Sequence, residues 1–352
     1  MPLKRRQLLG LSALALGAGA WRLGMGWAAP SEQAEQGNGP SRGDLRLVLI
    51  SDLNGPYGST SYIEPVHRGV ALIPSLKPDL VLCAGDMVAG QKRGLAPEQL
   101  AAMWSGFDRD VLAPLRRGGC PFAPAMGNHD ASSARSGGRY VFAEDRAEAA
   151  RFWQPRRDNL GLELLDASGF PYHYALVVGE LIVLVWDASS AAVPAAQLAW
   201  ADQLLASPVA RRARHRLVMG HLPLRPVGHG RDRPGEVLVA ADAIQALLER
   251  HQVEAYISGH HHVWFPGRIG ELDLIQLGAL GSGPRRLLGQ NRPGFQTLTL
   301  LDFFAGTGER RETTLDLRSL KPVPPEQLPD QLVDRGGRVL RRRQSEPLVT
   351  AG

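Results

Sequence analysis

A nearly continuous apolar run close to the start of the chain ends in polar residues, reading LRLVLISDLN from Leu45 to Asn54. Apolar residues that follow one another without alternation are typical of a strand buried on both faces of a sheet. A second run, LVLCAGD from Leu80 to Asp86, has the same layout. We therefore expect two buried strands that each present an acidic side chain, Asp52 or Asp86, at their carboxyl ends.

The segment between these two runs predicts a helix, because apolar residues recur at helical spacing from Tyr62 to Leu76. The result is a strand-helix-strand unit. A second helix is expected from Pro97 to Val111, followed by a strand from Pro121 to Met126. This alternation places the first half of the chain in the α/β class.

The second half is richer in strands, and Gly179-Glu180 is typical of a hairpin turn between two of them. The expected strands are 172–178, 181–186, 216–219, 255–257, 272–277 and 295–301, with helices at 195–206 and 240–251. Together the two halves favour two packed sheets with helices outside them.

Five short polar segments follow the expected strands. They are Asp52-Leu53-Asn54, Gly85-Asp86, Gly127-Asn128-His129-Asp130, Gly220-His221 and Gly259-His260-His261-His262. Taken singly, a Gly-Asp or Gly-His pair is an ordinary turn. Because all five stand at strand ends that one sheet system could bring together, we expect their side chains to converge on one site.

The residue types in these segments suit a pair of metal ions. Two divalent metals roughly 3.5 to 4 Å apart need a bridging carboxylate and several neutral ligands, and Asp86 is a candidate for the bridge. Carboxylate and amide oxygens with imidazole nitrogens form a mixed ligand set compatible with Mn, Fe, Zn or Co. The sequence therefore predicts a dinuclear site without sulfur ligands.

The five segments resemble the motif series of the calcineurin-like metallophosphoesterase family, over the span from Asp52 to His262. The resemblance implies a metallo-dependent phosphatase fold, a double β-sandwich of two mixed sheets flanked by helices. It also implies two divalent or trivalent metal ions and hydrolysis of a phosphate mono- or diester by a hydroxide that bridges them. The substrate would be a phosphorylated small molecule or a lipid-linked phosphate.

The resemblance also assigns roles to single residues. One ion would be held by Asp52, Asp86 and His262, and the other by Asp86, Asn128, His221 and His260. His129 would stabilise the transition state or protonate the leaving oxygen, with Asp130 orienting its ring.

The chain departs from the family pattern at Asn54, where the family usually has His. Purple acid phosphatases also lack that His but supply a Tyr three residues after the bridging Asp, where this chain has Ala89. Asn54 either ligates through its carbonyl oxygen or leaves the first site weaker. The alternative to an enzyme is a binding protein that keeps the fold with impaired catalysis, and Asn54 is the feature in its favour.

Other residues near the motifs are weaker candidates. Tyr57, Arg225, His229, Trp264 and Arg285 lie in neighbouring loops, and we expect them to line the substrate pocket. His261 stands between two expected ligands, so its side chain is expected to point away from the metals. The other histidines, His67, His173, His215 and His251, have no motif context and are expected to be structural.

The ends of the chain predict processing and disorder. Residues 1–29 contain Lys4-Arg5-Arg6, an apolar stretch and Ala28-Ala29, the layout of a signal peptide of the twin-arginine type. We expect export through the twin-arginine machinery to the periplasm or outside the cell, with no stable membrane span after signal removal. The remaining predicted parts are a linker over 30–43, a catalytic domain over 44–320, and a Pro- and Arg-rich tail over 321–352 that we expect to be poorly ordered.

The basic character of the whole chain comes mainly from its start. The sequence has 40 Lys and Arg against 35 Asp and Glu, and residues 1–29 hold four of the basic residues and no acid. Removing them leaves 36 basic against 35 acidic residues, a net charge of +1. This charge argues against nucleic acid as the substrate. The two cysteines, Cys83 and Cys120, lie in apolar surroundings and are interpreted as small apolar fillers, with a disulfide between them left open.

Overall fold

The computed structural model describes residues 40–281 and 283–343. The expected signal peptide and most of the expected linker lie outside these residues. The compact unit that contains the described residues begins at Pro40. None of its described helices is both long and apolar enough to cross a bilayer.

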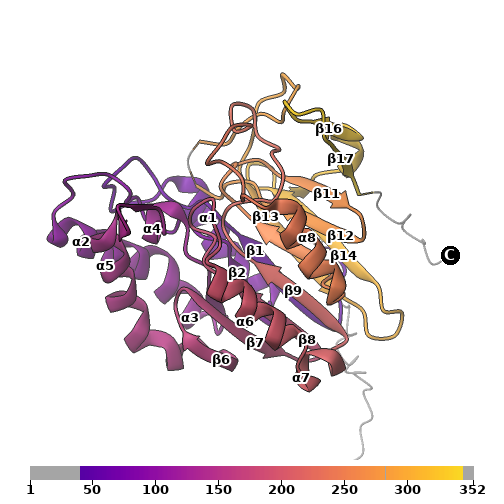
Figure 1. Ribbon diagram of the computed structural model, residues 1–352, viewed down its shortest axis with the longest axis horizontal. Coiled ribbons are helices and arrows are strands. Elements are labelled where there is room, and N and C mark those ends of the chain that lie inside the picture. The colour runs from indigo at the N-terminus through magenta and orange to yellow at the C-terminus, as the bar shows by residue number, and fades with distance from the viewer. Residues whose placement is uncertain (1–39, 282, 344–352) are drawn as a thin grey trace, which may run out of the picture. The chain divides into compact units, whose positions relative to one another are not determined.

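The first of two large sheets has six strands, with β1 and β13 at its centre (Figure 1). β1 runs parallel to β2 and antiparallel to β13, so the sheet is mixed. The strands, in spatial order, are β15 (Lys321–Pro322), β14 (Arg310–Asp316), β13 (Thr297–Phe303), β1 (Leu45–Ile50), β2 (Leu80–Cys83) and β3 (Phe122–Pro124).

The second sheet has nine strands and is also mixed. Its parallel strands are β8, β9, β10 and β12, each paired with the next in the spatial order below. Antiparallel pairing adds β7 and β6 at one side and β11, β17 and β16 at the other. The spatial order is β16 (Gln331–Val333), β17 (Val339–Arg342), β11 (Phe265–Ile269), β12 (Leu272–Gln276), β10 (Ala255–Ser258), β9 (His215–Met219), β8 (Leu181–Val185), β7 (His173–Val178) and β6 (Glu163–Gly169). A small separate hairpin joins β4 (Arg135–Ser136) to β5 (Arg139–Tyr140).

Helices lie on the outer sides of the sheets (Figure 1). The α-helices are α1 (Glu64–Leu72), α2 (Pro97–Phe107), α3 (Ala113–Arg117), α4 (Asn128–Ala131), α5 (Ala143–Trp153), α6 (Ala195–Leu205), α7 (Pro208–Arg212) and α8 (Ala241–Arg250). The shorter helical turns are η1 (Ile73–Leu76), η2 (Asp108–Leu112), η3 (Gln154–Asn159) and η4 (Pro325–Gln327).

Alternation along the strands of the second sheet builds two cores. In β8, Val183 belongs to the core that the second sheet shares with β1 and β2. The next residue, Leu184, points to the other side, into a core that includes Ala201 of α6 and Leu248 of α8. One face of this sheet therefore packs on the first sheet and the other on helices. The predicted double β-sandwich of mixed sheets with flanking helices is confirmed.

Most of the expected strands and helices are present, and the predicted hairpin at Gly179 joins β7 to β8. The sequence analysis missed β6, β11 and β14. β11 contains Pro266 and Gly267, and β14 reads RRETTLD with few apolar residues. Neighbouring strands stabilise these segments through backbone pairing, which leaves no apolar periodicity for a sequence pattern to reveal.

The prediction of a poorly ordered tail is wrong for residues 321–343. β17 extends the second sheet by pairing with β11, and Leu332 and Leu340 are each only 3% exposed. Arg343 forms ion pairs with Asp273 at 2.9 Å and with Glu312 at 2.6 Å. The basic composition suggested a solvated tail, but partners distant in the sequence neutralise these charges and the two leucines anchor the segment.

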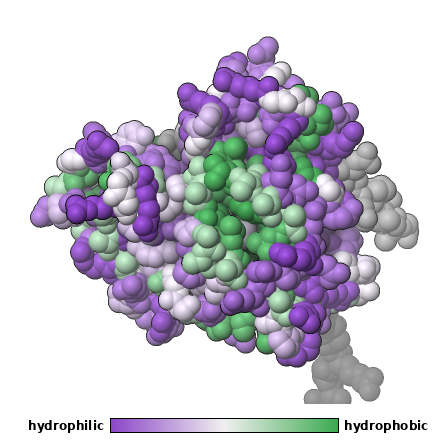
Figure 2. All heavy atoms as spheres, viewed as in Figure 1, coloured by the Kyte–Doolittle hydropathy of each residue, from purple (hydrophilic) through white to green (hydrophobic). Residues whose placement is uncertain are grey.

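Cys83 and Cys120 are buried free cysteines, in agreement with their interpretation as apolar fillers. On the face drawn in Figure 2, hydrophilic residues dominate the periphery and apolar residues gather toward the middle. Val239, which directly precedes α8, is 58% exposed.

Candidate metal centre

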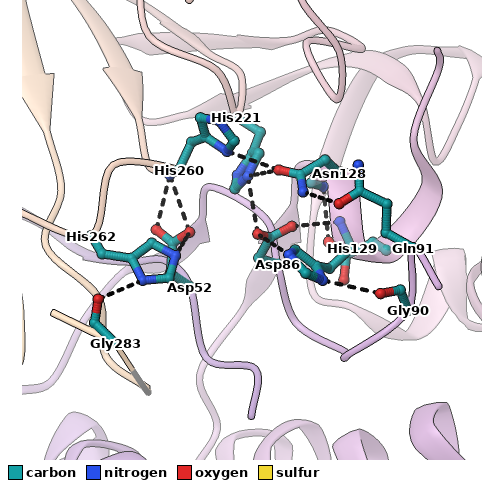
Figure 3. A network of polar contacts seen from close by, with 12 residues as sticks. Asp52, Asp86, Gly90, Gln91, Asn128, His129, His221, His260, His262 and Gly283 are labelled. Carbon is teal, nitrogen blue, oxygen red and sulfur yellow. Dashed lines mark hydrogen bonds and ion pairs between the residues drawn. The ribbon is translucent and has the colours of Figure 1, made fainter. Parts of the chain in front are cut away.

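The five polar segments lie together at the carboxyl ends of strands from both sheets. Asp52 follows β1, Asp86 follows β2, His221 follows β9, and His260 follows β10. Figure 3 shows these side chains facing one another. Parallel strands in each sheet deliver their carboxyl ends to the same edge, which explains the convergence.

The backbone at this site adopts a conformation that side chains normally avoid. Positive φ angles occur at Asp52 (54°), Asp86 (55°), His260 (67°) and His262 (55°). Left-handed backbone at non-glycine residues costs free energy and persists where the surroundings impose it. In this protein it turns the side chains of four expected metal ligands toward a common centre.

Glycine is needed where the loops of the site meet. A Cβ atom at Gly127 would collide with the carboxylate and the backbone amide of Asp86, and one at Gly259 would collide with Ser51 and Asp52. The glycines of the Gly-Asn and Gly-His motifs therefore permit the close approach of segments that carry the ligands.

One group of donors centres on the side chain of Asn128. Its Oδ1 atom lies 2.9 Å from Nε2 of His221 and 2.8 Å from Nδ1 of His260. The amide nitrogen of Asn128 donates to Gln91 Oε1 at 2.6 Å, which turns Oδ1 toward the two imidazoles. Asp86 Oδ2 completes the group at 3.2 Å from His221 Nε2.

The outer nitrogen of each imidazole in this group is already engaged. Nδ1 of His221 lies 2.7 Å from the carbonyl oxygen of Ala84, and Nε2 of His260 lies 2.9 Å from Glu236 Oε2. When the outer nitrogens donate to these oxygens, the inner nitrogens carry lone pairs directed at Asn128 Oδ1. Hydrogen-bond acceptors whose lone pairs face one another this closely require a shared cation or additional protons. These nitrogen and oxygen atoms are therefore suitable ligands for a metal ion.

The pKa values of the two imidazoles in this group shift in opposite directions. Burial alone would lower the pKa of His221, but the nearby Asp86 carboxylate raises it to about 9. Burial lowers the pKa of His260 to about 4, and the neighbouring His221 acts in the same direction. A metal ion bound between these groups would displace the proton from His221.

A second group of donors consists of Asp52, Asp86 and His262. Nε2 of His262 lies 3.3 Å from Asp52 Oδ1, while its Nδ1 lies 3.0 Å from the carbonyl oxygen of Gly283. Burial would raise the pKa of Asp52, but the adjacent His262 imidazole lowers it below its usual value. The two groups share Asp86, as expected of a bridging carboxylate.

Glu236 is a residue of the site that the sequence analysis missed. Besides His260, its carboxylate contacts Arg231 at 2.5 Å. Burial opposes ionisation, yet the hydrogen bond to His260 and the contact with Arg231 lower the pKa of Glu236 to about 2. Glu236 lies in a loop without a recognisable motif, and only folding brings it to His260. A carboxylate that accepts the outer imidazole proton orients a ligating histidine and increases its basicity.

We predict that Glu236→Gln weakens the second metal site about tenfold to hundredfold, because the loss of charge reduces the basicity of His260. Calorimetric titration of the metal-free protein measures both sites. Glu64→Gln, at an exposed position of α1, is the matched control and should bind like the wild type. Unchanged affinities in Glu236→Gln would show that the carboxylate does not support His260.

His129 lies beside the metal-ligand groups, with its ring held by a main-chain oxygen. Its Nδ1 is 3.0 Å from the carbonyl oxygen of Gly90, and its Nε2 is 4.0 Å from Asp86 Oδ2. The ring centroid of Tyr57, a residue 56% exposed, lies 5.1 Å from that of His129. Nε2 thus faces the expected metal position, and Tyr57 lies beside it.

The expected contact between Asp130 and the ring of His129 is wrong. Asp130 accepts hydrogen bonds from the backbone amides of Met87, Val88 and Gly127 at 2.8 to 2.9 Å. These bonds occupy both of its oxygens and fasten the loop after β2 to the loop after β3. The carbonyl of Gly90 orients the His129 ring instead.

The remaining candidates for the substrate pocket have different surroundings. Arg225 forms an ion pair with Asp242 on α8, and the side chain of His229 is exposed. The indole of Trp264 is buried and donates to Glu312 on β14. Arg285 lies next to the expected ligand His262, because its backbone amide donates to the His262 carbonyl oxygen at 3.0 Å.

His261 points away from the metal-ligand groups, as expected, but it is fully buried. Its Nδ1 accepts hydrogen bonds from the amides of Val227 and Gly228, and its Nε2 lies 2.9 Å from the carbonyl oxygen of Glu236. It therefore attaches the loop that carries Glu236 to the segment of ligands. Asn54 is buried, with its backbone amide bonded to the carbonyl of Asp86, and its ligation of a metal remains a prediction.

Comparison with known proteins agrees with this architecture. The model of the calcineurin-like phosphoesterase family matches residues 45–264. A dimetal phosphatase from Danio rerio is 14% identical, with 77% of this chain and 95% of that chain covered and a TM-score of 0.50. GAP50, described as the anchor in the inner membrane complex of Plasmodium, is 14% identical, with 80% and 87% covered and a TM-score of 0.47. Among curated proteins no match is found.

Proposed function

Since this chain belongs to the calcineurin-like phosphoesterase family, we propose that it is a metal-dependent hydrolase of phosphate mono- or diesters. The observation that supports this most directly is the cluster formed by Asn128, His221 and His260, whose facing atoms require a shared cation or additional protons. Two metal ions, when bound, acidify a water molecule for attack on phosphorus and neutralise charge on the phosphoryl oxygens.

The ligands we propose for the two ions overlap at one residue. Asp52, Asp86 and His262 would hold the first ion, with Asn54 as a further oxygen donor. Asp86, Asn128, His221 and His260 would hold the second. Mn, Fe, Zn and Co are all compatible with these oxygen and nitrogen donors.

His129 is the proton donor in this proposal. The Gly90 carbonyl accepts from Nδ1, so Nε2 is the atom that points into the site and can exchange a proton with the departing ester oxygen. Asp130 supports it indirectly by holding the two loops that carry Asp86 and His129.

Hydrolysis of matched chromogenic phosphate mono- and diesters tests the proposal. Metal-free protein reconstituted with Mn, Fe, Zn or Co should release the chromophore, and protein kept metal-free should not. Protein that binds two ions yet hydrolyses none of the esters would contradict catalysis and favour the binding-protein alternative.

We also propose that the protein is exported through the twin-arginine machinery, on the strength of Arg5, Arg6 and the apolar stretch that follows. Replacing both arginines with lysine should retain the precursor inside the cell, as measured by immunoblots of cell fractions. Equal export of the variant and the wild type would contradict this route.

A further inference from the structure

A cavity of about 60 Å³ lies beside the stretch of chain that directly follows the expected ligand His262. Its walls come from Val263 and Trp264, from the loop 285–297, and from the segment 323–329 that precedes β16. Trp264 follows the expected ligand His262 by two residues. The cavity and the metal-ligand segment therefore share one stretch of chain, which leads into β11 (Figure 1).

Apolar side chains form much of the cavity wall. Examples are Trp264, Leu287, Phe295, Val323 and Leu328. A volume of this size has room for several water molecules, or for a compact apolar group of about four carbon atoms. A long hydrocarbon chain would extend beyond it.

Arg285 connects the cavity to the metal centre. It lines the cavity, and its backbone amide donates to the carbonyl of His262 at 3.0 Å. Within residues 40–281 and 283–343, its buried Nε atom has no hydrogen-bond partner and its guanidinium has no ion pair at 4.0 Å or less. Arg225 and Arg231, in the neighbouring loop, are each paired with a carboxylate.

The electrostatic surroundings of Arg285 combine both signs of charge. Arg231 contributes positive charge to these surroundings, while Glu236 and Asp52 contribute negative charge. A half-buried cation of this kind gains free energy when an anion reaches it. The forked donors of a guanidinium suit phosphoryl oxygens in particular.

On the basis of the proposed function, we propose that this cavity binds a compact apolar group on the leaving alcohol of the substrate, while Arg285 binds a phosphoryl oxygen. The substrate class is then a small phosphate ester with a short branched or cyclic apolar group. The family match ends at residue 264, and most residues of the cavity wall lie beyond it.

Phosphonates test the cavity without requiring turnover. Because each buried methylene contributes about 0.8 kcal/mol, isobutylphosphonate should bind the metal-loaded protein about tenfold to fiftyfold more tightly than methylphosphonate. Decylphosphonate should bind no more tightly than isobutylphosphonate. Calorimetry measures the three dissociation constants.

Two variants with matched controls separate the two parts of the proposal. Gln290→Trp fills the cavity from an exposed position on its wall, so it should remove the preference for isobutyl and leave methylphosphonate binding unchanged. Gln331→Trp, on β16 outside the cavity, is its control. Arg285→Ala should weaken all three phosphonates about tenfold to hundredfold, the loss expected for hydrogen bonds to a charged group, whereas the exposed neighbour Arg286→Ala should not.

The outcomes distinguish the cavity from the proposed reaction. If the wild type binds methyl- and isobutylphosphonate equally, or if Gln290→Trp weakens both alike, the cavity does not receive the leaving group. Equal binding by Arg285→Ala and the wild type would overturn the role of Arg285. A preference for isobutylphosphonate without hydrolysis of any ester would uphold the cavity and contradict the hydrolase.

Discussion

Replacing Asp86 with Asn should remove both metal ions and lower kcat/KM roughly ten-thousandfold. Asp86 belongs to both donor groups, and its Oδ2 lies 3.2 Å from His221 Nε2. A neutral amide cannot balance two cations, although Asn can still accept the backbone hydrogen bond that His129 donates to Oδ1. A loss of this size in kcat/KM is expected because catalysis depends on both metal ions, and both depend on Asp86.

Elemental analysis of the reconstituted protein measures the metal content directly. The wild type should contain close to two ions per chain, and Asp86→Asn should contain far less than one. Asp158→Asn is the control, because Asp158 is exposed and forms an ion pair with its neighbour Arg157. A variant that retains two ions would show that Asp86 is not the bridge.

The second large effect is expected at His129. Replacing His129 with Asn should lower kcat roughly a hundredfold to ten-thousandfold, the range of general acid catalysis, while both metal ions remain bound. The reason is that Nε2 faces the site but lies 4.0 Å from Asp86, and Nδ1 is occupied by the Gly90 carbonyl.

The control for His129 is His67→Asn, which makes the same change at an exposed position on α1. Steady-state kinetics and metal analysis on the same preparations separate the two possible roles. Loss of an ion in His129→Asn would identify His129 as a ligand and contradict its assignment as a proton donor.

Most of the fold could be predicted from local sequence patterns. Buried strands such as 45–50 and 80–83 are continuous apolar runs, and the helix over 62–76 has its own periodicity. The tail could not be predicted, because its order comes from partners far away in the sequence. Arg343, for example, is paired with Asp273 and Glu312.

The residues of the site can also be separated into those that the sequence predicts and those that only the fold brings together. Asp52 and Asp86 stand directly after strands, so their location at a sheet edge follows from the chain order alone. Glu236 and Arg285 lie in irregular loops where no pattern marks them, and their importance depends on contacts with His260 and His262 that exist only in the folded chain.

The sequence by itself determined the class of fold, the family and the set of candidate ligands, since these depend on residue types placed at strand ends. Only the tertiary structure decided which groups touch. In the folded chain, Asp130 accepts hydrogen bonds from three backbone amides, and the Gly90 carbonyl contacts the ring of His129. The carboxylate of Glu236 contacts the outer nitrogen of His260. The physical reason is that hydrogen bonds and ion pairs depend on distances of a few ångströms between side chains. Segments from both sheets set these distances together, and no single stretch of sequence contains them.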